Sequence, residues 1–82
     1  MMDVNKWNWI VDKSDMTCRS VENNVIIKME KKGGVLRGII HDMPMELFAE
    51  IAGYADGEKI IEKIVKTAEE KYLENRPGHL VV

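Results

Sequence analysis

Cysteine, signal sequences and long apolar runs are scarce or absent in this 82-residue sequence, and each shortage excludes a class of protein. The single cysteine, Cys18, cannot form an internal disulfide, so a disulfide-rich secreted scaffold is excluded and a reducing compartment is favoured. No stretch approaches the roughly 20 apolar residues of a membrane span. The first residues lack the basic segment and apolar run of a signal peptide. We therefore expect a cytoplasmic protein with no membrane partner.

A strong excess of one charge is also missing. The formal net charge is −2 and the sequence pI is 5.6, whereas dedicated nucleic-acid domains often exceed a pI of about 9. The one local basic excess comprises Lys28, Lys31, Lys32 and Arg37, against Glu30 alone. The electrostatic case for a nucleic-acid partner is therefore weak.

The composition that remains is that of a folded globular domain. Apolar residues make up 45% of the chain and charged residues 32%, which argues against overall disorder. The length suits one domain. We place this domain at residues 1–76, with a C-terminal tail at residues 77–82 that follows the helix-breaking Pro77 and Gly78. The tail is either a frayed terminus or a strand that adds to a sheet edge.

The strongest local pattern is a β-hairpin at residues 25–41. Two runs rich in β-branched residues, 25–30 and 35–41, flank a loop at residues 31–34. Gly33 and Gly34 adopt positive φ without steric cost, which a tight hairpin connection requires. Alternating residues then point to opposite faces, and Val25, Ile27 and Met29 share one of them.

Two further strands are predicted before the hairpin. Residues 7–11 alternate, with Trp7, Trp9 and Val11 on one face and Asn8 and Ile10 on the other. Residues 16–21 form a weaker strand, so the meander has three or four strands. Glu22-Asn23-Asn24 is typical of a turn.

The pattern changes from period 2 to period 3.6 after residue 43. A short helix begins near Pro44, with Asp42 or Met43 as the N-cap, and ends at Gly53. Its apolar stripe consists of Leu47, Phe48, Ile51 and Ala52. A longer amphipathic helix follows Asp56 and ends near residue 74. The apolar positions of this second helix are Ile60, Ile61, Ile64, Val65, Ala68 and Tyr72.

These elements predict an α+β fold, in which an antiparallel meander of three or four strands precedes a short helix and a longer C-terminal helix. The long helix is expected to pack on the face that carries Trp9 and Ile27. The opposite face still carries Ile10, Ile26, Val35 and Ile39, more apolar surface than a solvated face usually has. We interpret these four residues as a self-association face. The predicted function is a non-enzymatic interaction domain, a homodimer or a module that binds another protein.

Candidate catalytic and metal-binding residues are scattered. Cys18, His41 and Asp42 do not form a nucleophile system, because neighbouring strand residues point to opposite faces and Asp42 is better placed as a helix cap. With His79, the same residues lack the paired spacings of a zinc site. Glu46 and Glu50 share a helix face but are more typical of a solvated surface. We predict no catalytic residue, no metal and no cofactor.

A nucleic-acid-binding module is the alternative function. Lys28, Lys31, Lys32 and Arg37 would contact phosphates, and Trp7 and Trp9 on a strand face could stack unpaired bases. In outline, a meander followed by a helix resembles the Whirly and Pur-alpha repeats, which bind single-stranded nucleic acid on the sheet. The competing interpretation of the two tryptophans is that they pack under the long helix.

Overall fold

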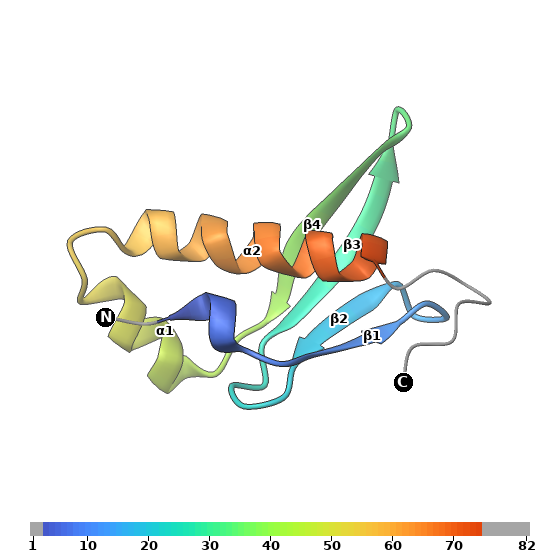
Figure 1. The fold of residues 1–82 in the computed structure, drawn as a ribbon. Coiled ribbons are helices and arrows are strands. Elements are labelled where there is room, and N and C mark those ends of the chain that lie inside the picture. Colours follow the sequence, from blue (N-terminus) through green and yellow to red (C-terminus); the bar gives the residue numbers. More distant parts are fainter. Residues whose placement is uncertain (1–2, 75–82) are drawn as a thin grey trace.

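The computed structural model describes residues 3–74, and Figure 1 shows four strands followed by two helices. The predicted tail at residues 77–82 lies outside the described residues. In chain order the elements are the 3-10 helix η1 (Val4–Lys6), the strands β1 (Trp9–Asp12), β2 (Thr17–Ser20), β3 (Ile26–Lys32) and β4 (Val35–Asp42), and the helices α1 (Met45–Ala52) and α2 (Gly57–Glu74).

The four strands form one antiparallel sheet in the order β1-β2-β3-β4, which confirms the four-stranded version of the meander. The β3–β4 hairpin extends further than the sequence predicts. Lys32 pairs with Val35, so Lys31 and Lys32 belong to β3 and the turn contains only Gly33 and Gly34. Both glycines have positive φ, 59° and 82°, as in the two-residue turns that match strand twist.

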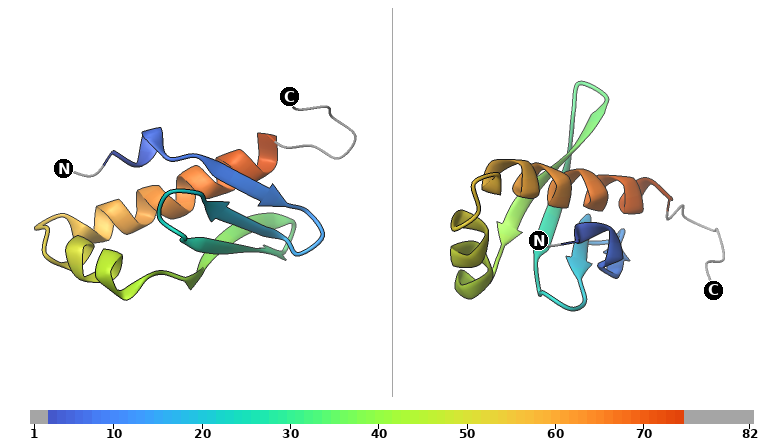
Figure 2. Two further views of the ribbon diagram at one scale, coloured as in Figure 1. Left: turned by 90° about the horizontal axis from the view of Figure 1, so that it is seen from below. Right: turned by 60° about the vertical axis from the view of Figure 1, so that its left-hand side comes forward.

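Helix α2 crosses one face of the sheet, as predicted, and buries the core between the two layers (Figures 1 and 2). From the sheet, Val25, Ile27 and Met29 are at most 2% exposed. From the helix, Ile64 and Ala68 are fully buried. The N-terminal η1 was not predicted, and it places Val4 beneath α2.

Helix α1 lies at the corner of the molecule and differs from its predicted form. Pro44 is the N-cap and makes no side-chain capping bond, while Asp42 is the last residue of β4. Leu47 and Ile51 pack on the core, but Phe48 is 58% exposed. The prediction that Phe48 shares their buried stripe is wrong, because α1 contacts only α2 among the described elements and can bury only a narrow side.

Neither of the two described helices is both long and apolar enough to cross a bilayer.

Candidate functional site: the uncovered sheet face

One face of the sheet has no described element packed on it. Of the two described α-helices, only α2 contacts the strands and η1. It lies on one side of the sheet (Figure 2). Side chains alternate along each strand, so the uncovered face receives every second residue. We call this surface the open face, and its apolar residues are Ile10, Ile26, Val35 and Ile39.

Strand register arranges the open face in rows. One row runs from Ile10 through Arg19 to Ile26, because Arg19 pairs with both. The next row runs from Thr17 through Lys28 to Ile39. Beyond these rows, Glu30 pairs with Arg37 and Lys32 with Val35. All four residues predicted for self-association therefore share one face, with basic side chains between them.

The exposure of these apolar residues is high for β-branched side chains in a sheet. Ile10 is 47% exposed, Ile39 46% and Val35 60%, whereas Ile26 is half-buried. On the covered face, by contrast, Ile27 is fully buried. The sheet therefore has apolar side chains on both faces, and α2 buries those of one face only.

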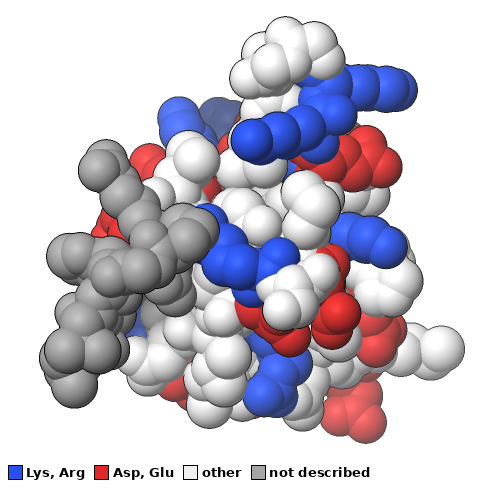
Figure 3. Space-filling view, turned by 90° about the vertical axis from the view of Figure 1, so that its right-hand side faces the viewer, with Lys and Arg blue, Asp and Glu red and all other residues white. Residues whose placement is uncertain are grey.

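The charges on the open face are of both signs. Lys28, Lys32 and Arg37 belong to the predicted basic set, whereas Lys31 alternates to the other side of β3. Arg19 was missed by the sequence analysis, since the weak β2 strand gave no firm register. The acidic partners in the same rows or beside them are Asp12, Glu30 and Asp42. Figure 3 shows basic side chains around the tip of the β3–β4 hairpin, with basic, acidic and uncharged side chains mixed below it.

The two tryptophans lie away from the open face. Trp7 and Trp9 both pack against the buried core, with ring centroids 6.0 Å apart. Trp9 pairs with Ser20, which is fully buried beneath α2. The structure therefore does not bring the tryptophans together with Lys28 and Arg37 on a shared surface.

The candidate catalytic residues are dispersed as well. Cys18 is fully buried on the helix side of β2, and His41 is exposed near the end of β4, with β3 between their strands. Burial raises the pKa of the Cys18 thiol to about 11, and the Lys71 ammonium offsets part of this rise. Glu46 and Glu50 are both exposed, and Glu50 accepts a hydrogen bond from the Tyr54 hydroxyl at 3.3 Å.

Among residues 3–74, no cluster of three histidine, cysteine or carboxylate side chains could hold a metal ion. His79 lies outside the described residues. The pKa of one other group, the Glu22 carboxyl, is also shifted. Hydrogen bonds from the backbone and side chain of Asn8 lower it. They tie the residue before β1 to the turn after β2.

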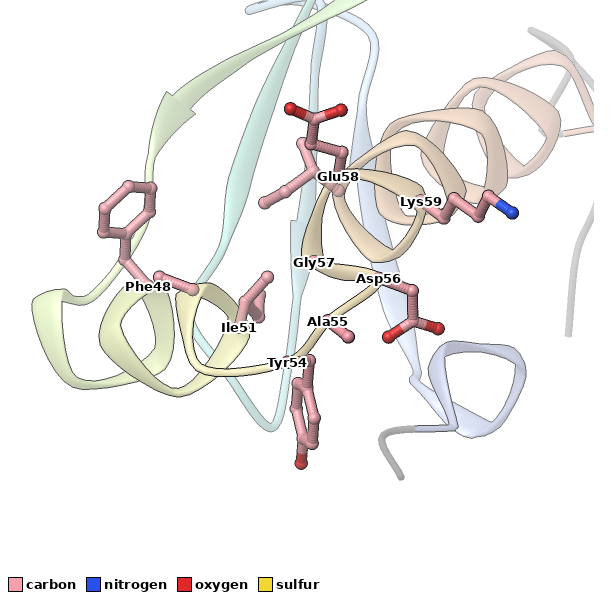
Figure 4. Close-up of a pocket in the computed structure, with 10 residues that line it drawn as sticks. Phe48, Ile51, Tyr54, Ala55, Asp56, Gly57, Glu58 and Lys59 are labelled. Carbon is pink, nitrogen blue, oxygen red and sulfur yellow. The ribbon is translucent and has the colours of Figure 1, made fainter.

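A second surface feature lies where α1 meets α2. A cavity of about 500 Å³ opens there, between Phe48 of α1 and the first two turns of α2. Figure 4 shows Ile51 between the Phe48 and Glu58 side chains, with Ala55 and Gly57 where the chain passes from α1 to α2. No sequence pattern predicts this cavity, because it depends on the angle between the two helices.

The fold and these surfaces define a two-layer α+β domain with one uncovered sheet face. Comparison with protein-family models, with curated proteins and with solved structures finds no match. The outline likeness to Whirly and Pur-alpha repeats therefore gains no support.

Proposed function

We propose that this chain is a non-enzymatic interaction domain that forms a homodimer through its open face. The observation that carries the proposal is that Ile10, Ile39 and Val35 are each close to half exposed or more on a face that no described element covers. Apolar surface of this kind marks interaction sites more often than it remains in water. We place the protein in the cytoplasm, because its one cysteine suits a reducing compartment.

A twofold dimer suits the distribution of charge on the open face. In such a dimer each patch meets its own copy, so a surface with only basic residues would repel itself. Here Arg19, Lys28 and Arg37 are interspersed with Asp12 and Glu30, so both signs of charge lie on the face that would meet its own copy. Burying the exposed halves of the isoleucines supplies roughly 25 cal/mol per Å² of apolar area.

Light scattering coupled to size exclusion tests the proposal at micromolar concentration. We expect a mass near twice 9.4 kDa for the unaltered chain. Ile39→Asp and Ile10→Asp should each shift the protein to monomer, because an aspartate at either position would be buried in the interface without a partner. Both sites are about half exposed, so neither substitution should prevent folding.

Leu73→Asp is the matched control, since Leu73 is 59% exposed but lies on α2, in the other layer. It should leave the dimer intact. A monomeric mass for the unaltered chain, or an unchanged dimer in both isoleucine variants, contradicts the proposal.

A nucleic-acid-binding module is the second candidate. The observation that favours it is that Arg19, Lys28 and Arg37 lie in adjacent rows of the same face. The placement of Trp7 and Trp9 under α2 removes the stacking platform that would bind unpaired bases. This candidate is therefore the weaker of the two.

A further inference from the structure

Strand β4 is the last strand of the sheet, and within residues 3–74 no strand pairs with its outer edge. Met29 pairs with Gly38, yet the Met29 N–H donates to Met16 on the opposite side, at 2.7 Å. The Gly38 N–H accordingly points away from β3, and it donates to Oε2 of Glu69 at 2.7 Å. Alternation along the strand places the backbone groups of Leu36 and Ile40 on the same outer edge. A side-chain carboxylate thus occupies the position that a carbonyl of a neighbouring strand would take.

Helix α2 passes directly over this edge. A Cβ at Gly38 would lie 3.2 Å from Cγ1 of Val65 and 3.2 Å from Cγ of Glu69. Toward its N-terminus the helix continues beyond β4, as Figure 1 shows. Ile61 and Val65, one turn apart, are only half-buried, whereas Ile60 and Ile64 on the sheet side are 7% exposed or less. Ile61 and Val65 are only half-buried because α2 extends past β4, the last strand of the sheet.

From this arrangement we infer a groove between the edge of β4 and α2. We define the groove by the outer edge of β4 at Gly38, by Val65 and Ile61 of α2, and by Phe48 of α1. Ile61 and Phe48 also line the cavity of about 500 Å³ between the helices, so the inferred groove and the cavity share these two residues. Phe48 is 58% exposed, which is high for an aromatic side chain.

The charges along the groove are mainly acidic, with Lys59 as the one basic side chain that lines the cavity. Glu58, Glu62 and Glu69 are spaced by four and seven residues, so they share the flank of α2 that carries Val65. Lys59, Lys63 and Lys66 share the neighbouring flank. Figure 4 shows the Glu58 side chain beside the cavity opening and the Lys59 side chain pointing away from it. A ligand in the groove would therefore meet apolar surface bordered by carboxylates.

We propose that this groove binds an extended peptide segment of a partner protein as an added strand beside β4. The peptide backbone would pair with Leu36, Gly38 and Ile40, and a peptide carbonyl would replace the Glu69 carboxylate on the Gly38 N–H. An aliphatic side chain would enter the cavity between Phe48 and Ile61. A basic side chain next to it would face Glu58 and Glu62.

A second copy of β4 does not fit this position. Adjacent strands lie about 4.8 Å apart, whereas packed helices need about 8–10 Å between their axes. In an antiparallel β4–β4 pair both α2 helices would lie on the same face, each directly over its own Gly38. They would overlap, so the groove is a site separate from the proposed dimer interface.

The test uses the full chain, labelled with ¹⁵N, and a synthetic heptapeptide, acetyl-Arg-Thr-Leu-Thr-Leu-Thr-Arg-amide. Its alternate residues present leucine and arginine to the groove in either chain direction. We expect amide shift changes centred on Leu36, Gly38 and Ile40. A peptide with glutamate in place of both arginines should bind at least about tenfold more weakly. A peptide N-methylated at every residue should not bind, since none of its residues keeps a backbone N–H group that could pair with the carbonyls of β4.

Two variants locate the site. Ile61→Lys and Phe48→Lys replace partly exposed apolar residues with a cation that repels the arginines of the peptide, and each should weaken binding by about tenfold or more. Ile10→Asp, on the open face of β1 at the opposite edge of the sheet, should leave binding unchanged while it disrupts the dimer, so failure of one proposal is distinguishable from failure of the other. No shift change at millimolar peptide, full binding of the N-methylated peptide, or shift changes centred on Ile10 and Arg19 would each overturn the groove assignment.

Discussion

At the scale of single residues, side-chain chemistry here is set by which face of a strand a residue occupies. Cys18 alternates to the helix side of β2 and is fully buried. Arg19, its neighbour, points to the open face and is exposed. One step along the chain therefore separates a core residue from an interface candidate.

Cys18 should be unreactive in the folded protein. Because burial raises the pKa of its thiol to about 11, almost no thiolate exists at pH 8. We expect Ellman's reagent to label the folded chain very slowly at pH 8 and the urea-unfolded chain at once. Equally rapid labelling of both forms would show that Cys18 is accessible.

The same shift makes stability depend on pH. The thiol loses its proton near pH 9 in the unfolded chain and near pH 11 in the folded chain. Its contribution is fully present below pH 9 and is lost as the pH rises toward 11, by up to about 2–3 kcal/mol. Cys18→Ala removes this titration, so the stability of that variant should fall less over the same range.

At the scale of elements, one lysine ties the β1–β2 turn to the end of α2. Lys13 Nζ donates to the Tyr72 carbonyl at 2.7 Å and lies 3.7 Å from the centroid of the Tyr72 ring. The ammonium therefore caps the C-terminal end of the helix and contacts an aromatic face. No sequence pattern indicates this contact, because the two residues are 59 positions apart.

Lys13→Met should lower the free energy of unfolding by about 1–2 kcal/mol, since it removes a capping hydrogen bond and a cation–π contact but keeps the aliphatic stem. Urea denaturation measures the change. Lys63→Met, at an exposed position of α2, is the control and should change stability by less than about 0.5 kcal/mol. Equal effects of the two substitutions would contradict a specific role for Lys13.

The crossing of α2 over β4 explains why a glycine stands in the middle of a strand. A Cβ at Gly38 would lie 2.9 Å from Cγ2 of Ile27 and 3.2 Å from Val65. The missing side chain allows the helix to approach the strand closely. The sequence marked Gly38 as a strand residue, but its partner could be known only from the packing of the layers.

At the scale of the whole molecule, the layered arrangement favours the proposed homodimer over the nucleic-acid module. It separates the tryptophans from the basic open face, and it leaves that face apolar as well as charged. We therefore expect single-stranded oligonucleotides to show no mobility shift with this protein, even near 50 mM salt, where phosphate contacts are strong.

A shift that disappears as the salt rises toward about 200 mM would reverse this conclusion. It would need to weaken in Arg19→Glu and in Lys28→Glu, which lie on the open face, while Lys66→Glu on α2 leaves it unchanged. That result would make the open face a phosphate-binding surface and the nucleic-acid module the better description.

The features that could be predicted from the sequence are those set by residues close together along the chain. Alternation of β-branched residues predicted the β3–β4 hairpin, two glycines predicted its turn, and a 3.6-residue period predicted α2. These signals are local, so they can be recognised without knowledge of the fold. They also predicted that Val25, Ile27 and Met29 would face the long helix, and all three are buried.

The features that could not be predicted are those set by packing between segments far apart in the sequence. The tertiary structure turned Phe48 outward, although its spacing matches the buried stripe of α1, because that helix contacts only α2. It placed Arg19 among the isoleucines of the open face, and it set α2 across the edge of β4. Strand register and helix angle bring these residues together, and neither is encoded in the periodicity of a single element.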